Sequence, residues 1–337
     1  MYEADLHSLP PHEWEFLPPM DVLGIDISKD DFHACLIQGA KRSKHSFPNA
    51  SSGYKQLQRW LKNRKSAPVH ACMEATGAYW LGLASAMHEC GATVSVVNPA
   101  RTALYARSQL RRTKTDSVDC EMIADFCNTQ PLEQWTPPAP ETLELRGILS
   151  YREHLVNQRT QCKQIVGQIS VSAQLKRLHT KQLKVLEQTI AALETEMQAI
   201  IGKHPLLHAD VMRVQSIPGI GFLSAVSLVA KLPMERIRDS KAAAAYAGVT
   251  PSERQSGTSV HGKPRICKTG NASLRRDLYM PALVAIRYNP TLKTFAERLR
   301  ARGKAPKVVI VAVMRKLIVL AYTLLKKGEA FSLQPTP

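Results

Sequence analysis

The stretch DVLGIDIS, residues 21–28, decides the fold of the first part of this chain. It is a short apolar run with Asp26 near its end, and a second apolar run, FHACLIQ at residues 32–38, follows closely. Two short apolar runs this close together are typical of a β-hairpin. We therefore expect two paired strands, and we expect Asp26 to lie on the first of them.

Beyond this hairpin, segments of helical and strand character alternate. The pattern predicts helices over residues 49–62 and 79–90, and strands over residues 68–76 and 92–98, with Glu74 at the end of the earlier strand. A hairpin followed by alternating helices and strands indicates a mixed α/β sheet covered on its faces. We expect this domain to span residues 21–130 and to end at the proline-rich linker QPLEQWTPPAPE.

The composition indicates a globular protein with a polyanionic partner. The chain has 337 residues, 44% of them apolar, and its 45 Lys and Arg residues exceed its 28 Asp and Glu residues to give a net charge of +17. Such a charge favours nucleic acid, because phosphate neutralisation dominates that binding. The seven cysteines form no Cys-x-x-Cys pair, which favours a reducing compartment over a disulfide framework or a zinc ribbon.

The two ends of the sequence show no targeting or membrane signal. Residues 1–20 are acidic and rich in proline, unlike a signal peptide, and we expect a disordered extension there. The most apolar segment, residues 307–325, is interrupted by Arg315 and Lys316 and is too short on either side to span a bilayer. We expect a buried C-terminal helix in a cytoplasmic protein with no membrane partner.

A heptad pattern follows the linker and predicts a helical coiled-coil connector over residues 141–205. One seam has apolar residues at alternating spacings of three and four: Leu183, Leu186, Ile190, Leu193, Met197 and Ile200. An earlier run keeps the same spacing with one polar intrusion: Ile148, Tyr151, Leu155, Gln158, Cys162, Ile165 and Ile169. Two long helices of this kind could pack on each other or on another subunit, and an ordinary amphipathic pair is the alternative.

The third region, residues 206–330, has a mostly helical pattern interrupted by a polar loop. Its turn SIPGIG, residues 216–221, resembles a helix-hairpin-helix element that offers N–H groups to a phosphate, although such a turn also simply joins two helices. Residues 245–279 are rich in Gly, Ser, Thr, Lys and Arg. A long polar loop of this kind favours a phosphate-facing role, with a solvated surface loop as the alternative.

Paired carboxylates stand out in this basic chain. In RRTKTDSVDCEMIADF, residues 111–126, Asp116 and Asp119 are three residues apart and would share a helix face. Asp116 could instead cap that helix. Together with Asp26 and Glu74 at strand ends, the two residues could converge above one edge of the sheet. Carboxylate oxygens suit Mg²⁺, for which Mn²⁺ can substitute, and such ions assist phosphoryl transfer.

Seven blocks of the chain resemble, in order, the DEDD transposases of the insertion-sequence one-ten family, which includes the Piv-type DNA invertases. The likeness covers roughly residues 20–330, and the C-terminal blocks look closer to the eleven-eleven subgroup. The blocks are GIDISKDDFH, CMEATGAYW, VVNPARTALYARSQLRRTKTDSVD, SIPGIG, AAAAYAGVTP, QSGTSVHGKPRICKTGNASLRRDLYMPALVA and RGKAPKVVIVAVMRKL.

The resemblance implies a RuvC-like domain of the ribonuclease H fold, a coiled-coil connector and a C-terminal transposase domain. It implies that Asp26, Glu74, Asp116 and Asp119 bind the metal and that Ser256 is the nucleophile of a phosphoserine–DNA intermediate. Ser252, Thr258 and Ser259 are competing hydroxyl groups near Ser256.

The expected partners are double-stranded DNA at the element ends and target, a non-coding guide (bridge) RNA, and further copies of the chain in a dimer or tetramer. The setting that the resemblance implies is a prokaryotic cytoplasm, in association with the nucleoid. The basic residues expected to contact nucleic acid are Arg107, Arg111, Arg112, Lys114, Arg254, Lys263, Arg265, Lys268, Arg275 and Arg276.

Two other functions fit parts of the pattern. A junction resolvase would use the same carboxylates to activate water, but it would leave the QSGTSVHGK loop and the heptad seam without a task. A non-catalytic nucleic-acid-binding protein would not need four acidic residues within a basic chain. The sequence therefore favours the recombinase.

Overall fold

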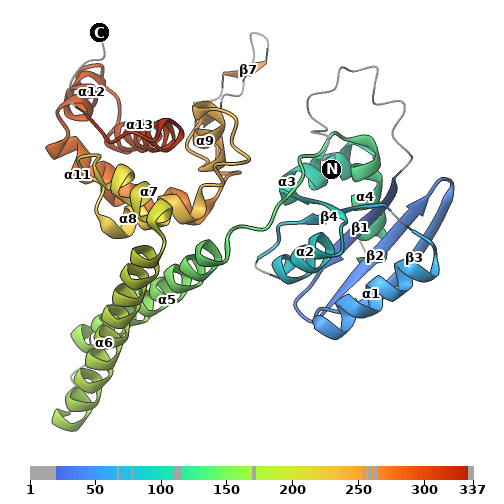
Figure 1. Ribbon diagram of the computed structural model, residues 1–337. Helices are drawn as coiled ribbons and strands as arrows, with labels where there is room; N and C mark the ends of the chain where they lie inside the picture. Colours follow the sequence, from blue (N-terminus) through green and yellow to red (C-terminus); the bar gives the residue numbers. More distant parts are fainter. Residues whose placement is uncertain are drawn as a thin grey trace. The chain divides into compact units, whose positions relative to one another are not determined.

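The computed structural model describes residues 20–66, 68–77, 79–109, 116–168, 172–252, 255–256, 260–261 and 265–332. For residues 116–117, 166–168, 255–256 and 260–261 the description covers the backbone alone, and the predicted extension over residues 1–20 lies outside it except for Met20. The chain divides into two compact units, an N-terminal unit up to Pro137 and a C-terminal unit from Pro138 (Figure 1).

The N-terminal unit is built on a five-stranded mixed sheet in the order β3-β2-β1-β4-β5. The strands are β1 (Asp21–Ile27), β2 (Asp31–Gln38), β3 (Lys41–Pro48), β4 (Val69–Glu74) and β5 (Thr93–Val97). The expected hairpin is confirmed, because β1 and β2 pair antiparallel, and β4 and β5 run parallel to β1. The mixed α/β fold expected for this part of the chain is therefore confirmed.

Strand β3 was not anticipated from the sequence. Its residues, KRSKHSFP, pair antiparallel with β2 along the edge of the sheet, and Phe47 is the one fully buried residue among them. An edge strand of this kind has no alternating apolar pattern, because most of its side chains face solvent.

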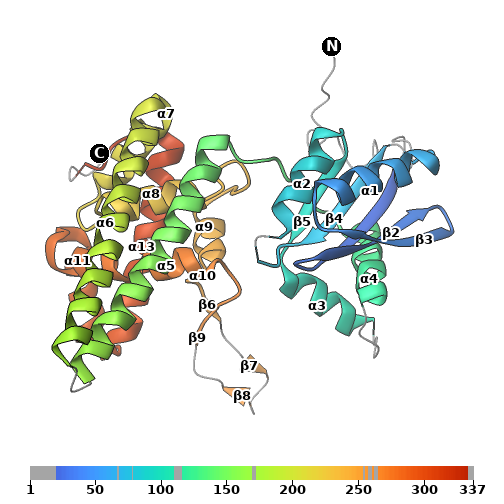
Figure 2. The ribbon, with the colours of Figure 1, turned by 90° about the horizontal axis from the view of Figure 1, so that it is seen from below.

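Helices cover both faces of this sheet (Figure 2). On one face, α1 (Ser51–Asn63) and α2 (Trp80–Glu89) pack on apolar side chains of β1, β2 and β4. On the other face, α3 (Pro99–Ser108) and α4 (Asp116–Thr129) pack together with Val22, Cys35 and Cys72. Trp135, within the proline-rich segment, is buried in the first of these two cores. Its backbone N–H donates to the Val94 carbonyl.

The backbone of α4 lies directly on β1 at Gly24. A Cβ atom at this position would be 2.2 Å from the Ala124 nitrogen and 2.3 Å from the Cys120 carbonyl oxygen. Backbone atoms of a packed helix cannot give way locally, so any side chain here must push the whole helix outward. Gly24 therefore sets the distance between α4 and the sheet.

We expect Gly24→Ala to destabilise the protein by about 1–3 kcal/mol or more, because the new methyl group overpacks this interface. Urea unfolding followed by tryptophan fluorescence measures the effect. The control is Gly147→Ala within a helix, where nothing lies within 4 Å of the added Cβ atom. It should be neutral or stabilising by up to about 1 kcal/mol. Equal stability of Gly24→Ala and the wild type would contradict the packing argument.

The C-terminal unit is mostly helical. It contains a long helical hairpin, α5 (Pro140–Gln168) and α6 (Ala173–Lys203), followed by α7 (Pro205–Gln215), α8 (Phe222–Lys231), α9 (Ser240–Tyr246), α10 (Ala272–Asp277), α11 (Tyr279–Tyr288), α12 (Pro290–Ala301) and α13 (Pro306–Lys327). Two short strand pairs, β6 (Pro251–Ser252) with β9 (Arg265–Ile266) and β7 (Gln255–Ser256) with β8 (Val260–His261), lie between α9 and α10.

The α5–α6 hairpin buries most of one predicted seam and departs from the other. In α6, Leu186, Ile190, Met197 and Ile200 are buried as expected, whereas Leu183 and Leu193 are half-buried. In α5, Leu155 and Cys162 are buried.

The other described members of the α5 run are not fully buried, and Ile148 is half-buried against the main C-terminal core. Tyr151 is 51% exposed and Ile165 is 44% exposed. Gln158 is also exposed, and Ile169 lies outside the described residues. The reason is that α5 starts within the main core, where Leu145 and Leu149 are buried and Arg146 donates to the Ala230 carbonyl of α8. This contact turns the buried face of α5 away from the predicted register.

Helix α13 forms the centre of the C-terminal core. Val313, Leu317 and Ala321 are fully buried, as expected for a core helix. Among the described residues it is also the one helix long and apolar enough to cross a membrane, although 44% of that stretch is buried within the protein.

The turn between α7 and α8 is held by packing. Gly219 has a φ of +109°, and a Cβ atom there would be 2.7 Å from Cα of Ala285 in α11. Its neighbour Pro218 accepts a hydrogen bond from the Asn289 side chain. These contacts account for the glycine, so a phosphate-binding role of this turn stays a prediction.

Candidate active site

Two acidic residues occupy matching positions on adjacent parallel strands. Strand β1 pairs with β4 in a register that joins Gly24 to Cys72 and Ile25 to Met73, so the next step places Asp26 beside Glu74. Side chains alternate between the two faces of a strand, and Gly24 and Cys72 face α4. Asp26 and Glu74, two residues further on, therefore face the same side. Both are half-buried.

Helix α4 covers this face of the sheet and carries Asp119. It begins at Asp116, and Asp119 follows one turn later, just before the Cys120 carbonyl that lies over Gly24. The hydrogen bond with Cys35 and burial raise the pKa of the Cys120 thiol, and the nearby Asp26 carboxylate adds to this rise. Asp26 and the start of α4 are therefore close enough to interact. The side chain of Asp116 lies outside the described part of the chain.

The carboxylates suit a hard cation by their chemistry, although their present positions do not form a tight cage. Within the described residues, no group of three or more His, Cys, Asp or Glu side chains is gathered closely enough to hold a metal ion. Three of the four expected ligands are described and lie on one face of the sheet, so the donor set fits an oxygen-preferring ion.

A buried threonine that the sequence did not single out contacts Glu74. Thr102, in α3, is fully buried, and its hydroxyl lies 2.5 Å from Glu74 Oε1 and 2.9 Å from the Pro99 carbonyl oxygen. The Asn98 side chain caps α3 and accepts from the Ala100 N–H, which fixes where the helix starts. The Asn-Pro start after a strand could have signalled the helix, but only the fold reveals that Thr102 reaches Glu74.

We expect Thr102→Val to lower the DNA cleavage implied by the sequence blocks about tenfold or more, because a hydrogen bond to a charged group contributes about 1.5–3 kcal/mol. Thr102→Ser keeps the hydroxyl and should restore cleavage. Single-turnover rates over a range of Mg²⁺ concentrations measure the effect. If Thr102 orients Glu74 toward a metal, the valine variant also needs more Mg²⁺ for half-maximal rate. An unchanged Mg²⁺ dependence would show that Thr102 contributes to packing and does not orient Glu74 toward a metal.

Other acidic residues of α4 serve a different purpose. Arg42 of β3 lies 3.2 Å from Glu121 and 2.8 Å from Asp125, and Lys44 lies 2.5 Å from Glu121. Hydrogen bonds to these carboxylates raise the pKa of Arg42 and of Lys44. These ion pairs join α4 to the edge strand β3 and separate Glu121 and Asp125 from the candidate metal ligands.

Cysteine pairs fill the space between α4 and the sheet. The Cys35 and Cys120 thiols form a hydrogen bond with each other, as do the Cys72 and Cys127 thiols, and all four side chains are buried. The hydrogen bond from Cys72 lowers the pKa of Cys127 to about 6, and His70 contributes to the shift. All seven cysteines are free thiols.

The predicted serine lies on a small β-ribbon of the C-terminal unit. Ser256 pairs with Val260 across β7 and β8, and Ser252 pairs with Arg265 across β6 and β9. The side chain of Ser256, the competing Thr258 and Ser259, and the basic residues Arg254 and Lys263 lie outside the described residues.

The predicted basic residues divide by their contacts. Arg107, Arg265 and Lys268 are exposed, whereas Arg111, Arg112 and Lys114 lie outside the described residues. Arg275 donates to the Ala247 carbonyl, and Arg276 forms an ion pair with Glu153 of α5. Arg275 and Arg276 thus support the fold around the ribbon, and their contact with nucleic acid stays a prediction.

A second ion pair braces the segment after the ribbon. Lys231 of α8 lies 2.5 Å from Asp277 of α10, and Ser227 donates to the same carboxylate. Lys231 is also 2.8 Å from the Ser273 hydroxyl. These contacts fix α10, which follows the ribbon, onto α8.

Comparison with known sequences identifies the family to which the chain is similar. Residues 23–169 match the model of the IS110 DEDD transposases, and residues 211–297 match that of the transposase IS116/IS110/IS902 family. The pilin gene-inverting protein of Moraxella lacunata is 31% identical over 314 residues, covering 92% of this chain and 97% of that protein. The chain belongs to the IS110 family of transposases. It is accordingly a DNA transposase, as expected from its sequence blocks.

Other relatives of this transposase extend the likeness. The Moraxella bovis pilin gene-inverting protein is also 31% identical over 314 residues. The transposase for insertion sequence element IS1111A of Coxiella burnetii is 25% identical over 353 residues, covering 92% of this chain and 91% of that protein. A structure of T. thermophilus RuvC with a Holliday junction substrate covers 35% of the transposase at 11% identity and a TM-score of 0.28, which is too low to weigh in the fold.

Proposed function

We propose that this transposase cuts and rejoins the DNA of an insertion sequence through a metal-assisted phosphoserine intermediate. The observation that carries the proposal is the matched placement of Asp26 and Glu74 on adjacent parallel strands, facing the helix that bears Asp119. The strand order, with a three-stranded antiparallel meander followed by two parallel strands, supports a RuvC-like domain of the ribonuclease H fold.

Asp26, Glu74, Asp116 and Asp119 would hold Mg²⁺ or Mn²⁺, which supplies charge neutralisation at the scissile phosphate. The Ser256 hydroxyl would give its proton to solvent water and attack phosphorus. The Oγ–P bond forms as the P–O3′ bond breaks, and the leaving 3′ oxygen takes up a proton. The reverse attack by a 3′-hydroxyl on the phosphoserine releases the serine. Each step exchanges one phosphate ester for another, so rejoining needs no external energy source.

The two alternative functions are less well supported. A resolvase that uses water needs no serine-bearing ribbon, and a non-catalytic binding protein needs no carboxylates on one sheet face. Membership of a transposase family and the full-length likeness to gene-inverting proteins favour the recombinase.

A denatured cleavage reaction should contain protein covalently joined to one DNA strand, and the modified peptide should include Ser256. Ser256→Ala should lose the adduct and recombination but keep DNA binding. Asp26→Asn and the chelation of divalent ions should also prevent the adduct, because the phosphate charge is no longer neutralised. If Ser256→Ala cuts DNA at the wild-type rate without an adduct, water is the nucleophile. An adduct on Ser252 or Ser259 would keep the mechanism and change only the residue assigned as the nucleophile.

The proposal includes a guide RNA, which the family resemblance implies and the net charge of +17 suits. Protein produced together with the DNA that flanks its gene should retain one specific non-coding RNA after a high-salt wash. Random cellular RNA is held by phosphate contacts alone and is released by salt. Recovery of no specific RNA would remove guidance from the proposal.

The proposal also includes a homo-oligomer formed through the α5–α6 hairpin. Near the tip of this hairpin, Ile165, Leu175, Leu178 and Val185 are 40–59% exposed, and such apolar surface favours association. Leu178→Glu should shift the protein toward monomer in analytical ultracentrifugation. A matched change on the polar surface, Lys184→Glu, should not. If the Leu178→Glu protein keeps the oligomeric mass of the wild type, the hairpin tip is not the interface.

A further inference from the structure

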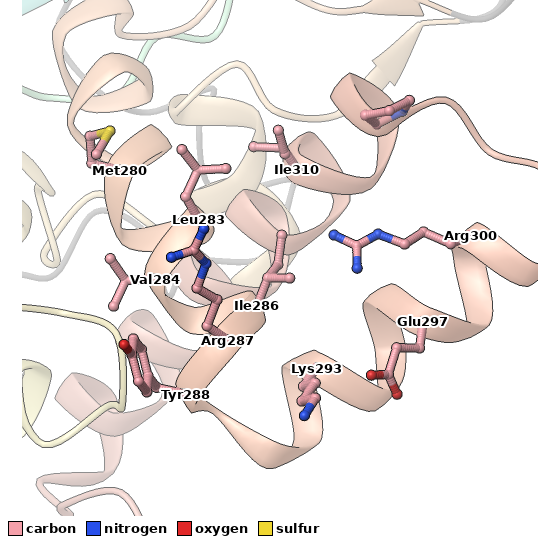
Figure 3. A pocket seen from close by; sticks show the side chains of 11 residues that line it. Met280, Leu283, Val284, Ile286, Arg287, Tyr288, Lys293, Glu297, Arg300 and Ile310 are labelled. Atoms are coloured by element: carbon pink, nitrogen blue, oxygen red, sulfur yellow. The ribbon is translucent and has the colours of Figure 1, made fainter.

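Three helices of the C-terminal unit enclose a pocket that none of the predicted sites uses. It has a volume of about 600 Å³ and lies between α11, α12 and the start of α13 (Figure 3). Leu283, Ile286 and Ile310 line its apolar part. Its size lies within the usual range for pockets that hold small organic groups.

The polar lining of this pocket is mostly cationic. Arg287 of α11 and Arg300 of α12 extend into the space between the two helices, and Lys293 lies at its edge (Figure 3). Glu297 is the single acidic residue among the described lining. Two guanidinium groups from different helices can bind one phosphate bidentately.

The cations of this pocket form no ion pair with the residues that the structure describes, in contrast to the few cations that join its helices and strands. Arg42, Lys231 and Arg276 each have a carboxylate partner. Among the described residues, no carboxylate lies within 4 Å of Arg287, Lys293 or Arg300, nor of the neighbouring Arg302, Lys304 and Lys307. Like charges held together without partners repel one another, so this cluster favours an anionic ligand.

An exposed aromatic residue stands at the rim of the pocket. Tyr288 is 70% exposed, and the neighbouring Met280 and Val284 on α11 are 62% and 38% exposed. A tyrosine ring offers a stacking surface for a base, and every base has such a face. Bases within a duplex are already stacked, so only an unpaired strand can use this surface.

We propose that this pocket binds a single-stranded segment of nucleic acid, with a phosphate between Arg287 and Arg300 and an unstacked base against Tyr288. This inference rests on the proposed function, in that the partner is DNA or RNA. Lys293 and the basic segment between α12 and α13 continue the positive surface along the strand. DNA and RNA share the phosphate and base chemistry, so both are tested.

The first test removes charge. Arg287→Gln/Arg300→Gln is compared with Lys163→Gln/Lys184→Gln, an equal loss of charge on the α5–α6 hairpin, both in an Asp26→Asn background that prevents cleavage. Binding of labelled single-stranded DNA and RNA is followed by fluorescence anisotropy from ~50 mM to ~200 mM salt. The pocket variant should bind more weakly, and its salt slope should fall by about 0.7 for each lost phosphate contact. The strand that loses more affinity is the ligand.

The second test removes the stacking surface. Tyr288→Ala should weaken single-strand binding by about 5-fold to 150-fold, and Tyr288→Phe should retain it, because stacking contributes about 1–3 kcal/mol per base. The control is Tyr151→Ala, which removes a tyrosine that is 51% exposed on α5. Crosslinking of a strand that carries 5-iodouracil should yield a modified peptide containing Tyr288.

Affinities and slopes that match those of the controls would overturn the proposal. It would also be overturned if an acidic peptide with the sequence of residues 1–19 bound the wild type but not the arginine variant, while strand binding stayed unchanged. That result would assign the pocket to a protein segment. These measurements involve no cleavage, so they stand whether or not the Ser256 adduct is found.

Discussion

The contact between the backbone of α4 and Gly24 of β1 determines the geometry of the N-terminal unit. No side chain separates the two elements at this point, so the helix lies as close to the sheet as backbone atoms allow. Around it, the thiols of Cys35, Cys72, Cys120 and Cys127 fill the remaining space with small apolar groups. This closeness fixes the distance of α4 from β1, and the position of Asp119, next to Cys120 on α4, depends on it.

Charge serves separate purposes in this chain. Glu121 and Asp125 are bound by Arg42 and Lys44 and help to hold α4 against β3, while Asp26 and Glu74 lie on the sheet face where a metal would be held. Cations divide in the same manner, since those paired with carboxylates join helices, whereas exposed cations without such partners attract phosphate. The proposed function needs both signs of charge, because cations would hold DNA and carboxylates would hold the metal ion that activates the scissile phosphate.

The two units hold the proposed chemistry on separate cores. The carboxylates depend on the sheet and α4, and the ribbon of Ser256 is fixed by α8, α9 and α10 through contacts such as Lys231 with Asp277 and Arg275 with the Ala247 carbonyl. Each core can therefore tolerate substitutions that leave the other unchanged. The buried Thr102 hydroxyl holds Glu74 through a hydrogen bond that no sequence motif indicates, and burial strengthens such a bond to a carboxylate.

Local sequence determined the hairpin, the parallel strands after it, the helical C-terminal half, the buried seam of α6 and the family, because these depend on apolar periodicity and on motifs within short segments. Tertiary structure decided what depends on distant partners. The polar edge strand β3 forms because β2 offers hydrogen bonds, and α5 turns its buried face toward α8 rather than keeping the heptad register. Thr102 at Glu74 and the pocket of Arg287 and Arg300 likewise arise only when separate elements meet. No local pattern encodes such meetings, since their energy comes from packing between segments far apart in the chain.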